Sequence, residues 1–288
     1  MRKLLLLPLA VAMMAIPASA HQGDGPFLAA QFPDDGLPTI DGNISEWQAL
    51  PDHFQVLIED TRNAYAERSG GELDKADLDF GFWGGYNANS DQLYAAVWVF
   101  DQLHVRDAPD ATDCTCNDDN YEFFTDGDHS LDDAAYGNGW WNIAVPPVEG
   151  KSHTPDVGFH TQPPHFVYAT SFEGEEFGES TYYYEVAFTP WDDLQRDGDG
   201  NDAGSVQSTL DPGEIIHWEM IVTDDDAELS HAEQYPNGTW KNDGWWSLGV
   251  GAAHSDRAPD WELDTDITSA MPTAVESKTW GRLKSRFR

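Results

Sequence analysis

Residues 93–100 read Leu-Tyr-Ala-Ala-Val-Trp-Val-Phe, and this stretch is the clearest indication of the fold class. Its apolar side chains occupy odd and even positions alike. Because successive side chains of a β-strand point to opposite faces of the sheet, a strand of this composition is covered on both faces. The stretch therefore predicts a central strand in a sheet that is packed on both sides.

Further strands are predicted on both sides of this segment. Five stretches rich in aromatic and β-branched residues lie at 79–83, 121–124, 165–170, 181–188 and 215–222. Turn-forming pairs such as Asp-Gly and Asn-Gly separate them, whereas helical periodicity is scarce. We expect an all-β domain over residues 21–270, a two-sheet antiparallel β-sandwich of jelly-roll or immunoglobulin type with little helix.

The composition excludes several classes of protein. The chain has 15 Lys and Arg against 52 Asp and Glu, a formal net charge of −37. Such a chain does not bind nucleic acid or an anionic membrane through electrostatic attraction. Its 12 Trp, 10 Tyr and 14 Phe also exclude a solvated, disordered chain. The acidic surplus fits either a salt-rich habitat or calcium binding.

The two ends of the chain differ from the rest. Residues 1–20 begin with Arg2-Lys3, continue as an apolar run and end in Ala-Ser-Ala, which predicts a secretory signal peptide cleaved before His21. We expect a secreted or periplasmic protein. Residues 271–288 are basic, and they form either a closing strand against the acidic body or a disordered tail.

The two cysteines, Cys114 and Cys116, lie one residue apart. Export permits a disulfide between them, although a bridge this tight is strained. A pair of free thiols or of metal ligands is the alternative.

Two tryptophan doublets, Trp140-Trp141 and Trp245-Trp246, follow glycine in loop-like sequence. In an extended segment one member of each pair faces the core and the other faces solvent. Exposed indoles offer flat apolar surfaces to the C–H faces of sugar rings at low entropic cost. The doublets are therefore candidate carbohydrate-binding residues, and the alternative is that all four pack internally.

An acidic loop supplies a candidate calcium site. Residues 197–202 read Asp-Gly-Asp-Gly-Asn-Asp, with side-chain oxygens alternating with flexible glycines. The candidate ligands are Asp197, Asp199, Asn201 and Asp202. A plain acidic turn is the other interpretation, because Ser208 stands where a helix–loop–helix calcium site has a bidentate Glu.

Three segments together resemble the family 9 carbohydrate-binding modules and the related sandwiches that include haem-binding domains. The first is 38–47, Pro-Thr-Ile-Asp-Gly-Asn-Ile-Ser-Glu-Trp. The second joins the strand ending at Asp101 to the acidic run 118–126, and the third is 184–191, Tyr-Glu-Val-Ala-Phe-Thr-Pro-Trp. The resemblance spans about 150 residues in order, and it implies a β-sandwich, structural calcium and sugar recognition.

The same resemblance marks a second acidic group. Asp101, Asp119, Glu122 and Asp126 follow the family pattern, which implies metal ligands or a buried polar scaffold. Solvated surface charges are the alternative.

We predict an exported, calcium-stabilised sandwich that binds carbohydrate without cleaving it, with a role in carbohydrate catabolism. One alternative is a glycoside hydrolase acting through a carboxylate pair, for which Glu122 and Glu185 are the first acids to test. Another is a haem-binding electron carrier. For that, Met220 and His217 would point to opposite faces of their strand, so core filling is the expected role of Met220.

Overall fold

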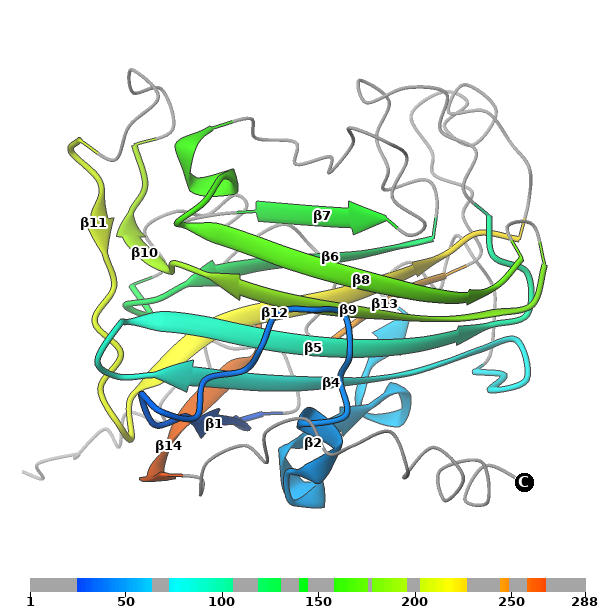
Figure 1. Cartoon of the computed structure of the whole chain (residues 1–288), viewed down its shortest axis with the longest axis horizontal. Helices are drawn as coiled ribbons and strands as arrows, with labels where there is room; N and C mark the ends of the chain where they lie inside the picture. Colours follow the sequence, from blue (N-terminus) through cyan, green and yellow to red (C-terminus); the bar gives the residue numbers. More distant parts are fainter. Residues whose placement is uncertain are drawn as a thin grey trace, which may run out of the picture.

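The computed structural model describes residues 25–63, 73–105, 119–130, 140–144, 158–175, 178–195, 203–226, 244–248 and 258–267. Within these ranges the chain is almost entirely β-structure (Figure 1), and its helical elements are three-residue 3-10 turns at Trp47–Ala49, Asp52–Phe54, Ile58–Asp60 and Phe159–Thr161. No helix in these ranges is long and apolar enough to cross a bilayer.

One large sheet curls into two layers that pack face to face. The front layer contains β1 (Phe27–Gln31), β2 (Gln55–Leu57), β4 (Leu78–Asn87), β5 (Gln92–Asp101), β9 (Ser180–Phe188) and β8 (Phe166–Gly174). The rear layer contains β7 (Trp140–Ala144), β6 (Asn120–Asp126), β12 (Ile215–Asp224), β13 (Gly244–Ser247) and β3 (Arg62–Asn63). A separate small sheet pairs β10 (Trp191–Asp193) with β11 (Val206–Gln207).

Strand β14 (Asp260–Ile267) joins the two layers, since it pairs with β12 on one side and with β1 on the other. The predicted β-sandwich is confirmed, but its strands are not all antiparallel. Strand β1 runs parallel to both β14 and β4. Parallel neighbours need a long connection, and the chain between β1 and β4 supplies one.

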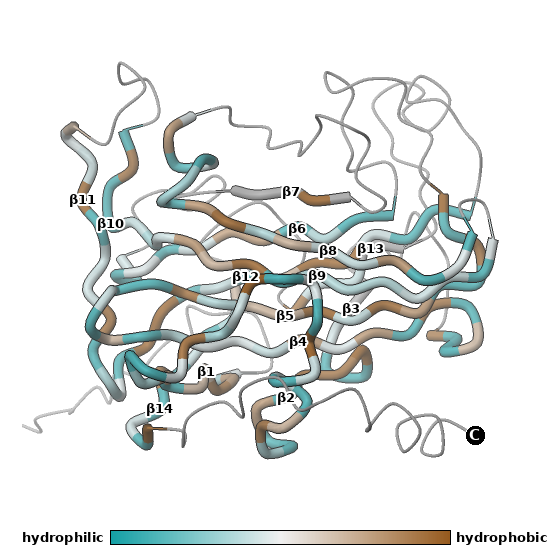
Figure 2. The backbone as a smooth tube through the Cα atoms, in the orientation of Figure 1, coloured by the Kyte–Doolittle hydropathy of each residue, from teal (hydrophilic) through white to brown (hydrophobic). Residues whose placement is uncertain are grey.

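The core between the layers is aromatic, as the composition predicts. Ring centroids of Tyr121 and Tyr184 lie 5.5 Å apart, and those of Phe188 and Trp218 also lie 5.5 Å apart, in each case across the two layers. Gly84 in β4 provides the room, because a Cβ there would collide with the indole of Trp261. Figure 2 shows hydrophobic residues recurring along the strands, while the turn that joins β4 to β5 is hydrophilic.

The outer face of the front layer is buried as well. Segment 38–54 crosses over β9, β5 and β4 (Figure 1, blue) and packs Trp47 and Phe54 against Tyr94 and Ala96 of β5. Val97 and Val99 of the same strand face the main core. Strand β5 is therefore covered on both faces, which confirms the prediction from its sequence.

Candidate functional site

The outer face of the rear layer is the first candidate surface. Trp218, Met220 and Val222 of β12 face the core, so the residues between them face outward. The pairing of β12 with β6 sets Glu219 opposite Phe124 and Thr223 opposite Asn120. A face of this kind would be expected to carry solvated charges, yet Glu122, Glu219 and Thr223 are fully buried on it.

The four candidate tryptophans all lie on strands of this layer. Trp140 and Trp141 belong to β7, and Trp245 and Trp246 belong to β13. Trp246 packs into the main core with 8% of its surface exposed. It pairs with Val222, another core residue, and so occupies the interior position of its doublet. The side chains of Trp140, Trp141 and Trp245 lie outside the described part of the structure.

The first acidic cluster forms where β5 and β12 terminate and β6 begins. Asp101 closes β5, Asp119 precedes β6 and Asp224 closes β12, and all three are buried. Ligand atoms of Asp101, Asp224 and Asp226 lie within 4.8 Å of one another, as do those of Asp101, His104 and Asp119. The alternative of solvated charges is therefore wrong for Asp101 and Asp119.

Hydrogen bonds fix the geometry of this cluster. Asp119 accepts the backbone N–H of Asp225 at 2.8 Å and a short bond from that of Val105. Asp101 accepts the N–H of Leu103 at 2.8 Å. Burial raises the pKa of Asp119 well above its usual value, and the negative charges of Asp101 and Asp224 raise it further. A site that disfavours its own negative charge in this way is suited to a cation.

The structure divides the four acids that the sequence grouped together. Asp119 immediately precedes β6 and Asp126 is its last residue. Seven residues of extended chain therefore separate them, a distance of about 20 Å or more along the strand. They cannot share an ion. Glu122 lies between them, paired with Ile221 and Asn142 on the outer face.

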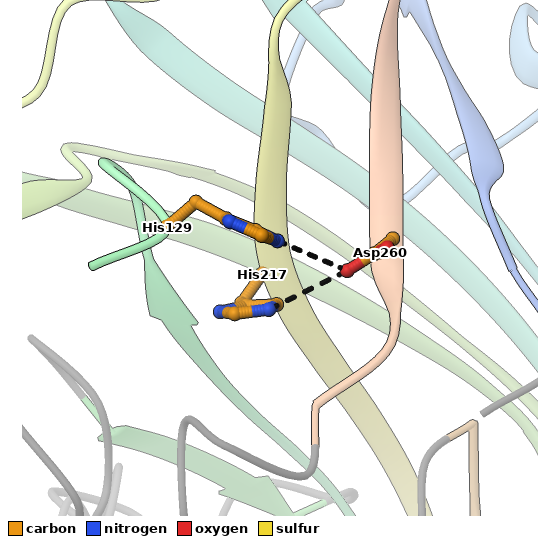
Figure 3. A group of neighbouring side chains, drawn as sticks. All are labelled: His129, His217 and Asp260. Atoms are coloured by element: carbon orange, nitrogen blue, oxygen red, sulfur yellow. Dashed lines mark hydrogen bonds and ion pairs between the residues drawn. The ribbon is translucent and has the colours of Figure 1, made fainter. Parts of the chain in front are cut away.

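Asp126 instead belongs to a second polar group, in which Figure 3 shows His129, His217 and Asp260 converging. The Nε2 atoms of His129 and His217 lie 3.2 Å and 3.4 Å from Oδ1 of Asp260. On its other side, Nδ1 of His217 lies 3.3 Å from Oδ2 of Asp126. Sequence reasoning singled out Asp126 but did not connect it with His129, His217 and Asp260, and it missed His104 and Asp224 as members of the first cluster, because these groups assemble from segments far apart in the chain.

Several predicted features fall outside the described residues. They are the signal peptide (1–20), Cys114 and Cys116, the acidic loop with Asp197, Asp199, Asn201 and Asp202, and the basic tail (271–288). The sequence-based expectations for these residues remain predictions.

Glu185 is a structural residue, which weakens the case for hydrolysis by Glu122 and Glu185. Its carboxylate accepts the N–H groups of residues 41–43 at 3.0, 2.7 and 3.1 Å and the indole N–H of Trp47 at 2.9 Å. Burial raises its pKa to about 7, although these donors lower it. Glu185 and Glu122 lie on opposite outer faces of a sandwich whose sheets are about 10 Å apart, too far to flank one glycosidic bond.

Met220 fills the core as expected. It is fully buried beside Trp218, and His217 points to the other face of β12. The two side chains cannot bind one haem iron from opposite faces of a strand.

Comparison with solved structures supports the fold. The chain is similar to a family 9 carbohydrate-binding module from Caldicellulosiruptor kristjanssonii in complex with cellotriose, with a TM-score of 0.51 and 13% identity over 86% of this chain and 98% of that one. A family 9 module from the same organism in complex with glucose gives a TM-score of 0.47 at 13% identity, over 85% and 99% of the two chains. No family model and no curated protein matches the sequence. This chain has the β-sandwich fold of the family 9 carbohydrate-binding modules, the fold that its three sequence segments predict.

Proposed function

We propose that this chain is an exported, non-catalytic carbohydrate-binding protein that acts in carbohydrate catabolism. Two lines of reasoning support the proposal. The fold is that of a module solved in complex with cellotriose, and the first twenty residues have the pattern of a secretory signal.

The observation that carries the proposal is the register of the rear layer. Trp140 pairs with Phe124, and Trp245 pairs with Thr223. Directly opposed residues of paired strands carry their side chains on the same face. Phe124 and Thr223 belong to the outward series of their strands, so the register places positions 140 and 245 in that series, and we propose Trp140 and Trp245 as the stacking members of their doublets.

The spacing of these two positions suggests the length of the ligand. Trp140 and Trp245 are separated by three strand spacings and by four residues along the strands. At about 4.8 Å per strand and 3.3 Å per residue, the diagonal is roughly 20 Å. Indoles exposed at both positions would form a platform whose length suits an oligosaccharide or polysaccharide chain better than a single sugar ring.

Single substitutions test this assignment. We expect Trp140→Ala and Trp245→Ala each to weaken binding at least about tenfold, because each removes one stacking surface worth 1.4 kcal/mol or more. Trp98→Ala is the matched control, since Trp98 lies on β5, in the front layer. Retardation in polysaccharide gels and a glycan array, both with calcium and with EDTA, provide the measurements.

The results separate cleanly. Wild-type retardation in both Trp140→Ala and Trp245→Ala would refute the platform. Binding of the wild-type protein to no glycan in either condition would refute carbohydrate binding itself.

We further propose that the first acidic cluster holds a structural calcium ion. Asp101, Asp119, Asp224 and Asp226 supply the carboxylate oxygens that calcium prefers, at the ends of three strands. The raised pKa of Asp119 supports a site that needs positive charge. Bound calcium would neutralise these carboxylates and hold the ends of β5 and β12 together.

A further inference from the structure

A row of polar residues crosses three adjacent strands, β6, β12 and β14, at the end of the rear layer where β6 terminates. His217 of β12 is the direct partner of Asp126 in β6 and of Asp260 in β14. Its imidazole is fully buried between the two carboxylates. The register alone therefore brings an acid to each side of one histidine.

A second imidazole joins the row from the turn after β6. The ring of His129 stacks on that of His217, with centroids 3.9 Å apart and planes inclined by 30°. Both Nε2 atoms approach the same oxygen of Asp260, at 3.2 and 3.4 Å (Figure 3). The side chains of His129 and Asp260 are 30% and 25% exposed, so the group can be reached from solvent although His217 cannot.

These separations match those between ligands around a small tetrahedral ion. Zinc lies about 2.0–2.1 Å from imidazole nitrogen and carboxylate oxygen. The edge of a tetrahedron with such bonds is roughly 3.3–3.4 Å, close to the two distances observed here. Binding of one ion by both imidazoles requires the His129 ring, which lies on a turn, to tilt out of its stack with His217.

We propose that Nε2 of His129, Nε2 of His217 and a carboxylate oxygen of Asp260 bind a divalent transition-metal ion of the zinc class. Asp126 is a positioning residue. By contacting Nδ1 of His217, it selects the tautomer whose Nε2 is free of a proton, as carboxylates behind metal-binding histidines do.

The donor set distinguishes this site from the proposed calcium site. Calcium takes oxygen ligands almost exclusively, whereas imidazole nitrogen favours zinc, copper and nickel. Two imidazoles and one carboxylate leave a coordination position for water or another group. The ion would fasten the turn after β6 to β12 and β14, next to the joint between the two layers.

Isothermal titration with zinc chloride, in an excess of calcium to fill carboxylate sites, tests the proposal. We expect His129→Ala to lower zinc affinity by more than tenfold without loss of fold, since His129 lies on a turn. Asp126→Asn should weaken it by about 10- to 100-fold. His53→Ala is the matched control, because His53 is exposed and lies in the front layer's covering segment.

A spectroscopic measurement completes the test. Cobalt in a tetrahedral site of this kind gives visible d–d absorption, which should appear with the wild-type protein and His53→Ala and be lost with His129→Ala. Zinc bound through the thiols of Cys114 and Cys116 would be unaffected by His129→Ala. Equal zinc affinity of the wild-type protein and His129→Ala would overturn the proposal.

Discussion

The hydrogen bond between Glu185 and Trp47 offers the most direct test of how the front layer is held together. One carboxylate oxygen accepts three backbone N–H groups of residues 41–43, and the other accepts the buried indole N–H of Trp47 at 2.9 Å. In Glu185→Gln the NH₂ group of the amide must face either the three backbone N–H groups or the indole N–H of Trp47. The less costly orientation keeps the three backbone bonds, so the NH₂ group then faces the indole N–H and two donors oppose each other.

The expected cost follows from that geometry. A hydrogen bond to a charged group contributes about 1.5–3 kcal/mol, and the buried indole N–H would also lose its acceptor. We expect Glu185→Gln to lower the free energy of unfolding by about 2–4 kcal/mol. For a domain of this size the midpoint of thermal unfolding would then fall by roughly 5–10 °C.

A double-mutant cycle isolates the bond. Trp47→Phe removes the donor, so in the double variant the amide no longer opposes an N–H group. The double variant should therefore lose at least about 1 kcal/mol less unfolding free energy than the sum of the losses in the two single variants. Urea unfolding at pH 8, above the pKa of about 7 for Glu185, measures the cycle with the carboxylate ionised.

Glu46→Gln is the matched control. The Glu46 carboxylate accepts one nearby N–H, that of Thr39 at 2.7 Å, and a glutamine can accept the same bond. We expect a cost below about 1 kcal/mol. If the Glu185→Gln and Trp47→Phe effects add within about 0.5 kcal/mol, the reasoning about their bond is refuted.

Three further predictions concern the turn, the doublet and the acidic cluster. Gly42→Ala should lower stability by about 1–3 kcal/mol in urea unfolding, because φ is +82° and a Cβ would lie 2.8 Å from the carbonyl carbon of Thr170. Gly204→Ala should cost less, because φ is +93° but the nearest atom to a Cβ there, in Gln195, lies 3.5 Å away. The reverse order of the two costs would contradict the argument. Trp246→Ala should cost about 3–5 kcal/mol in the same assay, since it leaves a cavity in the core. Trp245→Ala should cost under about 1 kcal/mol if its indole is exposed to solvent. In EDTA, thermal stability should fall as pH rises above about 4, because the pKa of Asp119 in the folded protein lies above its unfolded value of 3.8 and folding therefore disfavours ionisation. Calcium should remove this fall. A pH profile that is the same with and without calcium would count against the ion.

Local pattern was enough to predict most of the scaffold. The segments at 93–100, 181–188 and 215–222 all form strands close to the expected limits, namely β5, β9 and β12. Their composition restricts them to buried extended structure, because β-branched and aromatic side chains pack well on a pleated surface. The burial of β5 on both faces was likewise predictable from its uninterrupted apolar sequence.

The candidate sites were predicted less well. The family resemblance marked Asp101 and Asp119, but it also grouped Glu122 and Asp126 with them. Order along the chain does not show how far a strand carries one residue from another. The grouping of His217 with Asp126 and Asp260 was not predictable, since His217 drew attention only as a possible haem ligand and Asp260 belongs to no local motif.

The amino-acid sequence by itself determined an aromatic-rich, acidic β-sandwich and the approximate limits of its strands. Only the tertiary structure decided which strands are neighbours, in which register, and on which face each polar side chain lies. The physical reason is that alternation has a period of two residues, so it separates two faces without saying which is buried. Pairing between distant strands then sets His217 between Asp126 and Asp260 and Trp246 in the core.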